Sequence, residues 1–234
     1  MAALGEALTG AVGLMVSGDA TLGGIVALSL AVSLSAVLFA TLLGLPLGAA
    51  IAVGRFPGRR ALIVLLNALM GLPPVVAGLL VYLLLSRAGP LGEFGLLFTP
   101  SAMVIAQTVL VLPIIAALCR QSVEDAWAEY QEQLRSLGAD GARAALTLVW
   151  DIRFSLVTAV LAGLGRALAE VGAVIIVGGN IDGVTRVMTT SIALETSKGD
   201  LPLALSLGFI LIALVILLNA AAHLIKEAAE RRYG

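Results

Sequence analysis

The sequence predicts an all-α membrane protein with about five transmembrane helices, an N-terminal interfacial helix and a helical cytoplasmic loop. Of its 234 residues, 60% are hydrophobic, and the mean hydropathy is +1.07. Only 12% are charged, whereas an ordinary soluble domain carries about 25% charged residues. A water-soluble fold cannot bury so much apolar surface, so the bilayer must form part of the solvent.

Five apolar segments are long enough to cross the hydrocarbon core, which takes about 20 residues of helix. They cover residues 22–53, 61–85, 101–119, 154–177 and 201–224. The second span is interrupted at Pro73 and Pro74, because proline breaks the helical hydrogen-bond ladder. Gly44 and Gly48 in the first span form a pair of small residues that lets helices approach closely in lipid. The chain, residues 1–234, is therefore expected to be a single transmembrane domain.

Residues 1–20 are expected to be a segment of a different kind. The stretch 2–16 is short for a span and contains several glycines, so we interpret it as an interfacial helix. A tilted sixth span is the alternative. No basic region precedes its apolar part, so a cleavable signal peptide is not expected.

The distribution of basic residues predicts the orientation, since lysine and arginine favour the cytoplasmic side of a membrane. The side that holds the loops at 54–60 and 120–153 and the C-terminal tail receives ten of the 14 basic residues. The other side receives Arg87, Arg186 and Lys198, while Arg166 lies inside a span. We therefore expect a multi-pass protein of the cell membrane with its N-terminus outside and its C-terminus in the cytoplasm.

The sequence lacks the signatures of a catalytic site. It has no glycine-rich phosphate-binding motif that ends in Gly-Lys-Ser/Thr. No histidine, cysteine or carboxylate residues have metal-ligand spacing, and the sole cysteine, Cys119, is interpreted as a buried filler. The chain is expected to be no enzyme, to bind no cofactor or metal, and to have no nucleic-acid partner.

The polar stretch 120–153 is the most informative part of the chain. Two helical stretches flank Gly138, which suits a helix C-cap or a turn. An apolar face is expected on Leu134, Leu137, Ala142, Ala145 and Leu146. A short amphipathic helix between two spans is typical of an element that docks in a partner's groove; a solvated linker is the alternative.

The same loop carries a family resemblance. Glu132 and Gly138, six residues apart between two spans, resemble the EAA loop of ABC importer permeases. Other motifs, in the same order, resemble the molybdate, tungstate and sulfate permeases over roughly residues 25–225. They are Leu72-Pro-Pro-Val-Val76, Gly165-Arg-Ala-Leu-Ala-Glu-Val-Gly172, Gly179-Asn-Ile181, Thr185-Arg-Val-Met-Thr-Thr190 and Leu194-Glu-Thr-Ser-Lys-Gly-Asp-Leu201. The motifs at 185–190 and 194–201 look most like the tungstate branch. The loop departs from the family pattern at Gln133 and Leu134, which replace two alanines, and in the absence of a proline near Trp150.

The resemblance implies a type I ABC importer permease fold, with a coupling helix that docks on an ATPase. A homodimer is expected, because five helices rarely enclose a gated path alone. Two cytoplasmic ATPase subunits, which use ATP and Mg, and an extracytoplasmic oxyanion-binding protein would complete the assembly. Tungstate is the implied substrate, with molybdate or sulfate as alternatives. The implied coupling residues are Glu132, Arg135, Gly138, Ala139 and Arg143.

An ion pair is expected inside the membrane. Arg166 and Glu170 are four residues apart, so on one helix they would share a face. Arg166 lies about 18 Å into its predicted span, near the bilayer centre, where an isolated charge is costly. We expect the two side chains to pair, either beside the translocation path or as a structural lock between helices.

Residues 178–200 are expected to form an external gate. Three glycines lie among the six residues 178–183, so a regular helix is unfavourable there. A partly re-entrant segment would bring polar groups to the outer mouth, where hydroxyl groups could hold a dianion weakly. An ordinary external loop is the alternative. The residues expected at the path or gate are Pro73, Pro74, Arg166, Glu170, Asn180, Thr185, Arg186, Thr189 and Thr190.

Two other classes of function remain at this point. A stand-alone secondary carrier or channel would show inverted repeats and more polar residues at the bilayer midplane, and no such repeat is visible. A non-transporting membrane scaffold would need neither a proline-broken span nor a charged pair at membrane depth.

Overall fold

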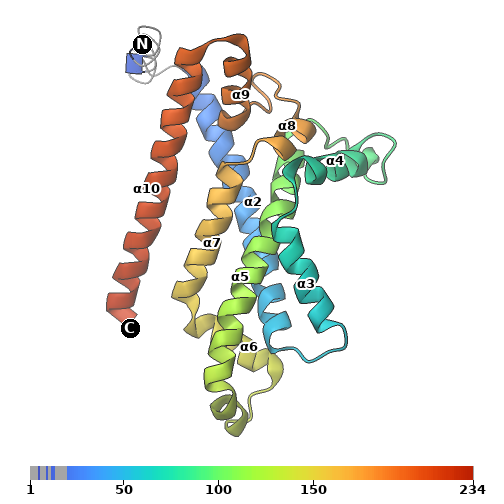
Figure 1. The fold of residues 1–234 in the computed structure, drawn as a ribbon, viewed down its shortest axis with the longest axis vertical. Helices are drawn as coiled ribbons and strands as arrows, with labels where there is room; N and C mark the ends of the chain where they lie inside the picture. Colours follow the sequence, from blue (N-terminus) through green and yellow to red (C-terminus); the bar gives the residue numbers. More distant parts are fainter. Residues whose placement is uncertain (1–4, 6–8, 10–11, 14–19, 234) are drawn as a thin grey trace. The chain divides into compact units, whose positions relative to one another are not determined.

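A computed structural model describes residues 5, 9, 12–13 and 20–233. Most of the predicted interfacial helix over 2–16 therefore lies outside the described residues. Over residues 20–233 every regular element is a helix, and there is no strand (Figure 1). The elements are α2 (Ala20–Val53), α3 (Arg59–Met70), α4 (Pro74–Leu85), the 3-10 helix η1 (Gly92–Phe94), α5 (Pro100–Ser136), α6 (Gly141–Asp151), α7 (Arg153–Leu168), α8 (Gly172–Gly178), α9 (Met188–Lys198) and α10 (Leu201–Tyr233).

Three of the described helices are long and apolar enough to cross a membrane. They are α2, the part of α5 from Pro100 to Leu134, and the part of α10 from Leu201 to Leu224. Two helix pairs meet the same test only together, across a bend: α3 with α4, and residues 143–151 with α7. The described part of the chain thus holds three to five candidate spans, which confirms the predicted all-α membrane class.

Two of the predicted spans have different ends in the structure. The third continues beyond residue 119, because α5 extends through Ser136. The fourth was expected as one helix over 154–177, and this is wrong: α7 ends at Leu168 and α8 begins at Gly172. At the break, the side chain of Glu170 accepts a hydrogen bond from the main-chain N–H of Ala173 at 2.9 Å. This bond caps the new helix.

The chain divides into two compact units. The first comprises residues 1–35, 73–107 and 168–219, and the second comprises residues 36–72, 108–167 and 220–234. One boundary between the units lies just before Pro73, in the interruption between α3, which ends at Met70, and α4, which begins at Pro74. The predicted interruption at Pro73 and Pro74 is therefore confirmed.

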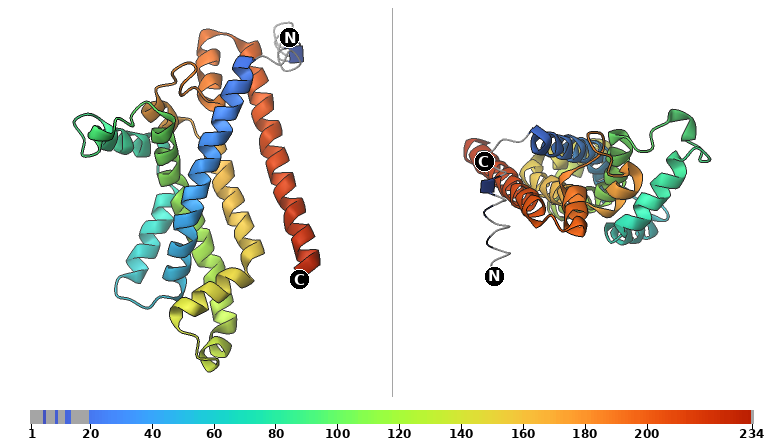
Figure 2. Two further views of the ribbon diagram at one scale, coloured as in Figure 1. Left: turned by 180° about the vertical axis from the view of Figure 1, so that it is seen from behind. Right: turned by 90° about the horizontal axis from the view of Figure 1, so that it is seen from above.

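The first unit contains α4, α8 and α9, together with residues 20–35 of α2, 100–107 of α5 and 201–219 of α10. Figures 1 and 2 show these helices. Leu22, Met188 and Leu207 are buried together at its core. Helix α4 lies against α8 at Gly78, where an added Cβ atom would stand 2.7 Å from the Cα of Ala173. Only glycine permits this approach between the two helices.

The second unit contains α3, α6, nearly all of α7, and parts of α2, α5 and α10. Helix α2 packs against α5 through Gly44 and Gly48, and a Cβ atom on Gly48 would stand 2.4 Å from the main-chain oxygen of Ala116. The predicted close approach at this small-residue pair is confirmed. The core beside it includes Cys119, which is fully buried as expected, and Leu148 of α6.

Candidate functional site

The helix–turn–helix loop at the end of α5 is built around Gly138. This residue has φ +73°, a left-handed conformation that glycine adopts at little cost. The N–H of Leu137 donates to the oxygen of Gln133 at 3.1 Å, and the N–H of Ala139 donates to the oxygen of Leu134 at 2.9 Å. These bonds satisfy main-chain carbonyl groups in the last turn of α5 and so cap its C-terminal end. The predicted C-cap at Gly138 is confirmed.

Helix α6 begins directly after this turn. The carboxylate of Asp140 accepts a hydrogen bond from the main-chain N–H of Arg143 at 2.8 Å, which satisfies one of the free donors of the first turn. Its inner face is formed by Ala144 and Leu148, which are 0% and 2% exposed. The segment from Arg143 to Asp151 meets α7 at a bend of 79°, so α6 crosses the end of its unit (Figure 1).

The predicted apolar face of this loop is only partly correct. Leu134 and Ala145 do pack against the core of the second unit. Leu137 and Leu146, however, are 81% and 72% exposed. The turn at Gly138 separates the two helices, so the apolar positions on α5 and α6 do not form one face. Helix α6 instead presents Leu146 and Trp150, which is also 72% exposed, on its outer side.

The structure brings the five predicted coupling residues into this loop. Glu132 is exposed near the end of α5, Gly138 and Ala139 form the turn, and Arg143 is exposed in the first turn of α6. Arg135 lies on the last turns of α5, and the placement of its side chain is outside the described structure. An exposed helix with large apolar side chains and flanking charges can enter a groove of a partner.

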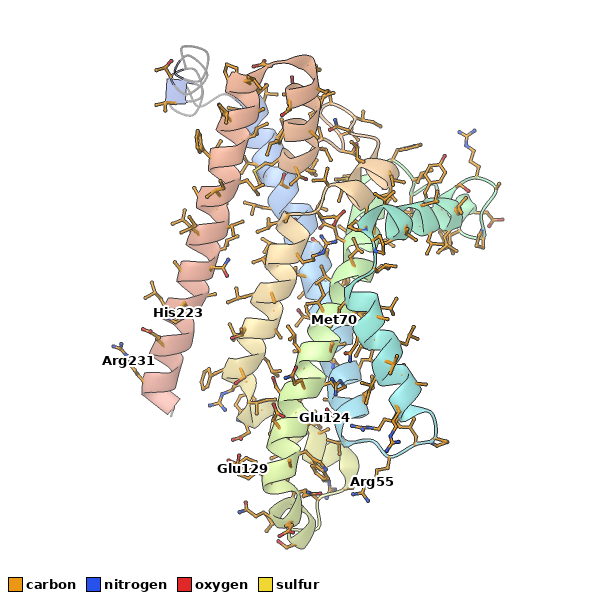
Figure 3. All side chains as sticks on the ribbon, in the orientation of Figure 1. Arg55, Met70, Glu124, Glu129, His223 and Arg231 are labelled. Carbon is orange, nitrogen blue, oxygen red and sulfur yellow. The ribbon has the colours of Figure 1, made fainter. Side chains whose placement is uncertain are left out.

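An ion-pair network lies beside this loop, and the sequence analysis missed it. Arg59 forms an ion pair with Glu124, and Arg120 pairs with the other oxygen of the same carboxylate. The Nε of Arg59 also donates to the main-chain oxygen of Ile51 at 2.7 Å. Figure 3 labels Glu124 on α5. The spacing of Arg120 and Glu124 was a visible signal, whereas the contact with Arg59 depends on the tertiary fold.

In the first unit, Glu170 occupies the break before α8. Its side chain is buried, with the residue 2% exposed, and its main-chain oxygen accepts a hydrogen bond from the hydroxyl of Thr189 at 2.7 Å. Arg166 lies on α7, which ends two residues before Glu170. The expectation that the two residues share one helix face is therefore wrong. Their pairing stays a prediction.

The predicted gate segment contains an irregular turn followed by a helix. Gly179, Asn180 and Gly183 all have positive φ values, of +72°, +51° and +69°, and α9 begins at Met188. The expected irregular backbone at 178–183 is confirmed. Arg186 pairs with Asp182 at 2.9 Å, so the cation of this segment is partly neutralised.

The threonines of this segment bond to the main chain. Thr185 is fully buried and donates to the oxygen of Gly178 at 2.6 Å, while its hydroxyl accepts from the N–H of Ile181 at 2.9 Å. The hydroxyl of Thr190 bonds to the main chain of Val187 at 3.1 Å. In this conformation the hydroxyls of Thr185, Thr189 and Thr190 hold the segment together. Their expected role toward a dianion stays a prediction.

The fold and these sites define a class of protein. Within the described residues no group of histidine, cysteine, aspartate or glutamate could hold a metal ion. What the chain presents is a set of apolar helices, two of them broken, and an exposed helix between two spans. This is the architecture of a multi-pass membrane permease.

Comparison with known proteins shows the family. The chain is 40% identical over 215 residues to a probable anion ABC transporter permease of Haloferax volcanii, covering 90% of this chain and 93% of the relative. It is 38% identical over 224 residues to the tungstate uptake system permease TupB of Peptoclostridium acidaminophilum, covering 96% and 98%. The corresponding TupB of Campylobacter jejuni is 38% identical over 172 residues, covering 74% and 72%. No family model matches the sequence.

The chain belongs to the family of ABC transporter permeases for oxyanion uptake. The resemblance drawn from the motifs is thereby confirmed at the level of the family, and the protein is a multi-pass membrane permease.

Proposed function

We propose that the oxyanion carried is tungstate, and that the chain works as a homodimer with two cytoplasmic ATPase subunits and an extracytoplasmic binding protein. The observation that carries this proposal is the 38% identity to a tungstate permease over 96% of the chain. The motif at Leu194–Leu201, which resembles the tungstate branch, supports the same substrate.

The loop centred on Gly138 is the proposed docking site for the ATPase. Leu146 and Trp150 are large, apolar and exposed, and such side chains are frequent anchors at the centre of protein interfaces. ATP and Mg belong to the partner in this proposal, because this sequence has no glycine-rich phosphate-binding motif. Closure of the ATPase dimer by ATP would move the docked α6, and the spans would alternate between inward-open and outward-open states.

The proposed orientation places this loop in the cytoplasm and the C-terminus on the same side. Its support is the excess of basic residues in the loops at 54–60 and 120–153. The segment 178–200 then lies at the outer side, where it would receive the oxyanion from the binding protein. Its compact hydrogen-bonded turn suits the closed state of an outer gate.

A transport assay on the reconstituted complex tests the substrate and the energy source together. The permease, its ATPase and its binding protein are placed in liposomes, and tungsten uptake is measured by elemental mass spectrometry. We expect uptake to require ATP and to resist competition by excess sulfate more than by excess molybdate. If molybdate or sulfate enters in preference to tungstate, the proposed substrate is wrong. Uptake without the ATPase would instead identify a secondary carrier.

The docking proposal has its own test. Trp150→Ser removes an exposed anchor, so we expect normal folded yield but loss of the ATPase from the purified complex. Thr147→Ser, on an exposed position of the same helix, is the matched control and should retain the ATPase. An unchanged amount of bound ATPase in Trp150→Ser would show that α6 docks elsewhere or not at all.

A further inference from the structure

A groove with a volume of about 760 Å³ opens in the second unit, where α2 ends and α3 begins. Its lining includes Arg55, Phe56, Arg59, Arg60, Glu124 and Trp127. Figure 3 labels Arg55 in the loop and Glu124 on α5. The groove lies beside α6, because Arg55 also lines a neighbouring pocket that contains Leu146. No residue of α6 lines the groove itself.

The charge in this groove is strongly unbalanced. Its one carboxylate, Glu124, is already shared by Arg59 and Arg120. Arg59 is further fixed by hydrogen bonds to the main-chain oxygens of Ile51 and Ala52. Arg55 and Arg60 are exposed, and neither forms an ion pair within the described part of the chain. The groove therefore presents two available guanidinium groups, those of Arg55 and Arg60, beside the fixed ion pair of Arg59 and Glu124.

An apolar surface continues directly from these cations. Val64 and Leu65, on the turn of α3 that follows Arg60, are 68% and 53% exposed. Phe56 in the loop is 43% exposed, and α2 ends just before the loop after a long apolar run. The groove thus lies at the end of spanning helices, the level at which arginine and aromatic side chains meet lipid headgroups.

We propose that this groove binds the headgroup of an anionic phospholipid. The guanidinium groups of Arg55 and Arg60 hold its phosphate, since arginine offers paired donors that match phosphate oxygens. The acyl chains lie along the exposed side of α3 at Val64 and Leu65. An inorganic anion would use the cations and leave this apolar surface uncovered, whereas a phospholipid matches both parts.

The tryptophan content makes the site directly measurable. The chain has two tryptophans, Trp127 and Trp150, so Trp150→Phe leaves a single fluorophore that lines the groove. This full-length variant is reconstituted in bilayers of equal parts phosphatidylcholine and phosphatidylglycerol, with bromine on the acyl chains of one lipid or the other. Quenching of Trp127 by each brominated lipid then gives their relative association constant at the groove.

We expect brominated phosphatidylglycerol to quench Trp127 more strongly than brominated phosphatidylcholine. Adding Arg55→Gln and Arg60→Gln should lower the relative association constant by roughly fivefold for each arginine, since each contributes about 1 kcal/mol near a membrane surface. The charge-matched control is Arg87→Gln with Arg231→Gln, two exposed arginines outside the groove, which should leave the preference unchanged.

Three results would overturn the proposal. Equal quenching by the two lipids in Trp150→Phe would show that the groove does not select an anionic lipid. A preference that survives in Arg55→Gln/Arg60→Gln, with the variant folded normally by gel filtration, would place the selection elsewhere. Loss of the preference on adding soluble glycerol phosphate would show that the groove binds free phosphate esters in place of lipid. None of these results depends on which oxyanion is transported.

Discussion

Replacement of Gly138 tests whether the turn between α5 and α6 couples the permease to its ATPase. The residue has φ +73°, and no atom lies within 4 Å of the place where a Cβ atom would stand. A side chain at this position therefore meets open space, and its whole effect comes from the left-handed backbone. That conformation costs roughly 1–2 kcal/mol for a residue with a Cβ atom, and a β-branched residue is less tolerant still.

A cost of this size lowers the population of the native turn by a factor of about 5–30. Because α6 stays anchored by Leu148, we expect Gly138→Val to fold but to hold α6 in the wrong position for the ATPase. The assay is the number of oxyanions transported per ATP hydrolysed in the reconstituted complex. We expect this ratio to fall several-fold in Gly138→Val.

Two matched variants make the result specific to the backbone. Gly138→Asn should lose less coupling, because asparagine enters the left-handed region more easily than other residues. Gly141→Ala lies three residues along, where φ is not positive and the nearest atom is 4.0 Å from the added Cβ, and it should transport normally. A normal ratio in Gly138→Val, or equal damage in Gly138→Asn, would refute this account of the turn.

Three further predictions concern packing, the broken span and topology. Gly48→Leu should abolish folded yield, because even its Cβ would stand 2.4 Å from a main-chain oxygen of α5; Gly165→Ala, with nothing within 4 Å, should be nearly neutral in the same detergent-extraction assay. Glu170→Ala should lower the free energy of unfolding by about 1 kcal/mol or more, because the hydrogen bond that caps α8 is lost. Glu170→Gln should lose less stability, because its amide oxygen can still accept that bond. Equal melting temperatures for the two variants would contradict the capping role. In a background without the native cysteine, an impermeant maleimide applied to intact cells should label a cysteine placed at Gly183 but not one at Gly138, and the reverse pattern would invert the proposed orientation.

The long spans were predictable because hydropathy is a local property of the chain. The apolar parts of α2, α5 and α10 appear in the sequence as continuous runs, and the glycine at 138 stands out between two helical patterns. The break between α7 and α8 was not predictable in the same way, since Glu170, the charged residue at the break, also suits a continuous helix on which it would pair with Arg166. It depends on the cap formed by Glu170 and on Gly172, where an added Cβ atom would stand 3.1 Å from the side chain of Val75.

The candidate site was predictable in part for the same reason. The positions of Glu132 and Arg143 relative to the turn followed from spacing along the chain. Which apolar side chains of α6 point inward did not, because the burial of Leu148 and the exposure of Leu146 depend on where α6 meets α5 and α2. The bonds that occupy the gate threonines likewise depend on contacts such as that between Thr189 and Glu170.

The anchoring of α6 has a mechanical consequence. Leu148 shares one buried cluster with Ala49 of α2 and Val123 of α5, and α2 and α5 touch with no side chain between them at Gly48. Close-packed interiors of this kind are barely compressible and transmit strain. A force applied to the outer side of α6 is therefore transmitted to α2 and α5, because the packing between them leaves little room for compression. A displacement of α6 would thus move α2 and α5 with it as one rigid group.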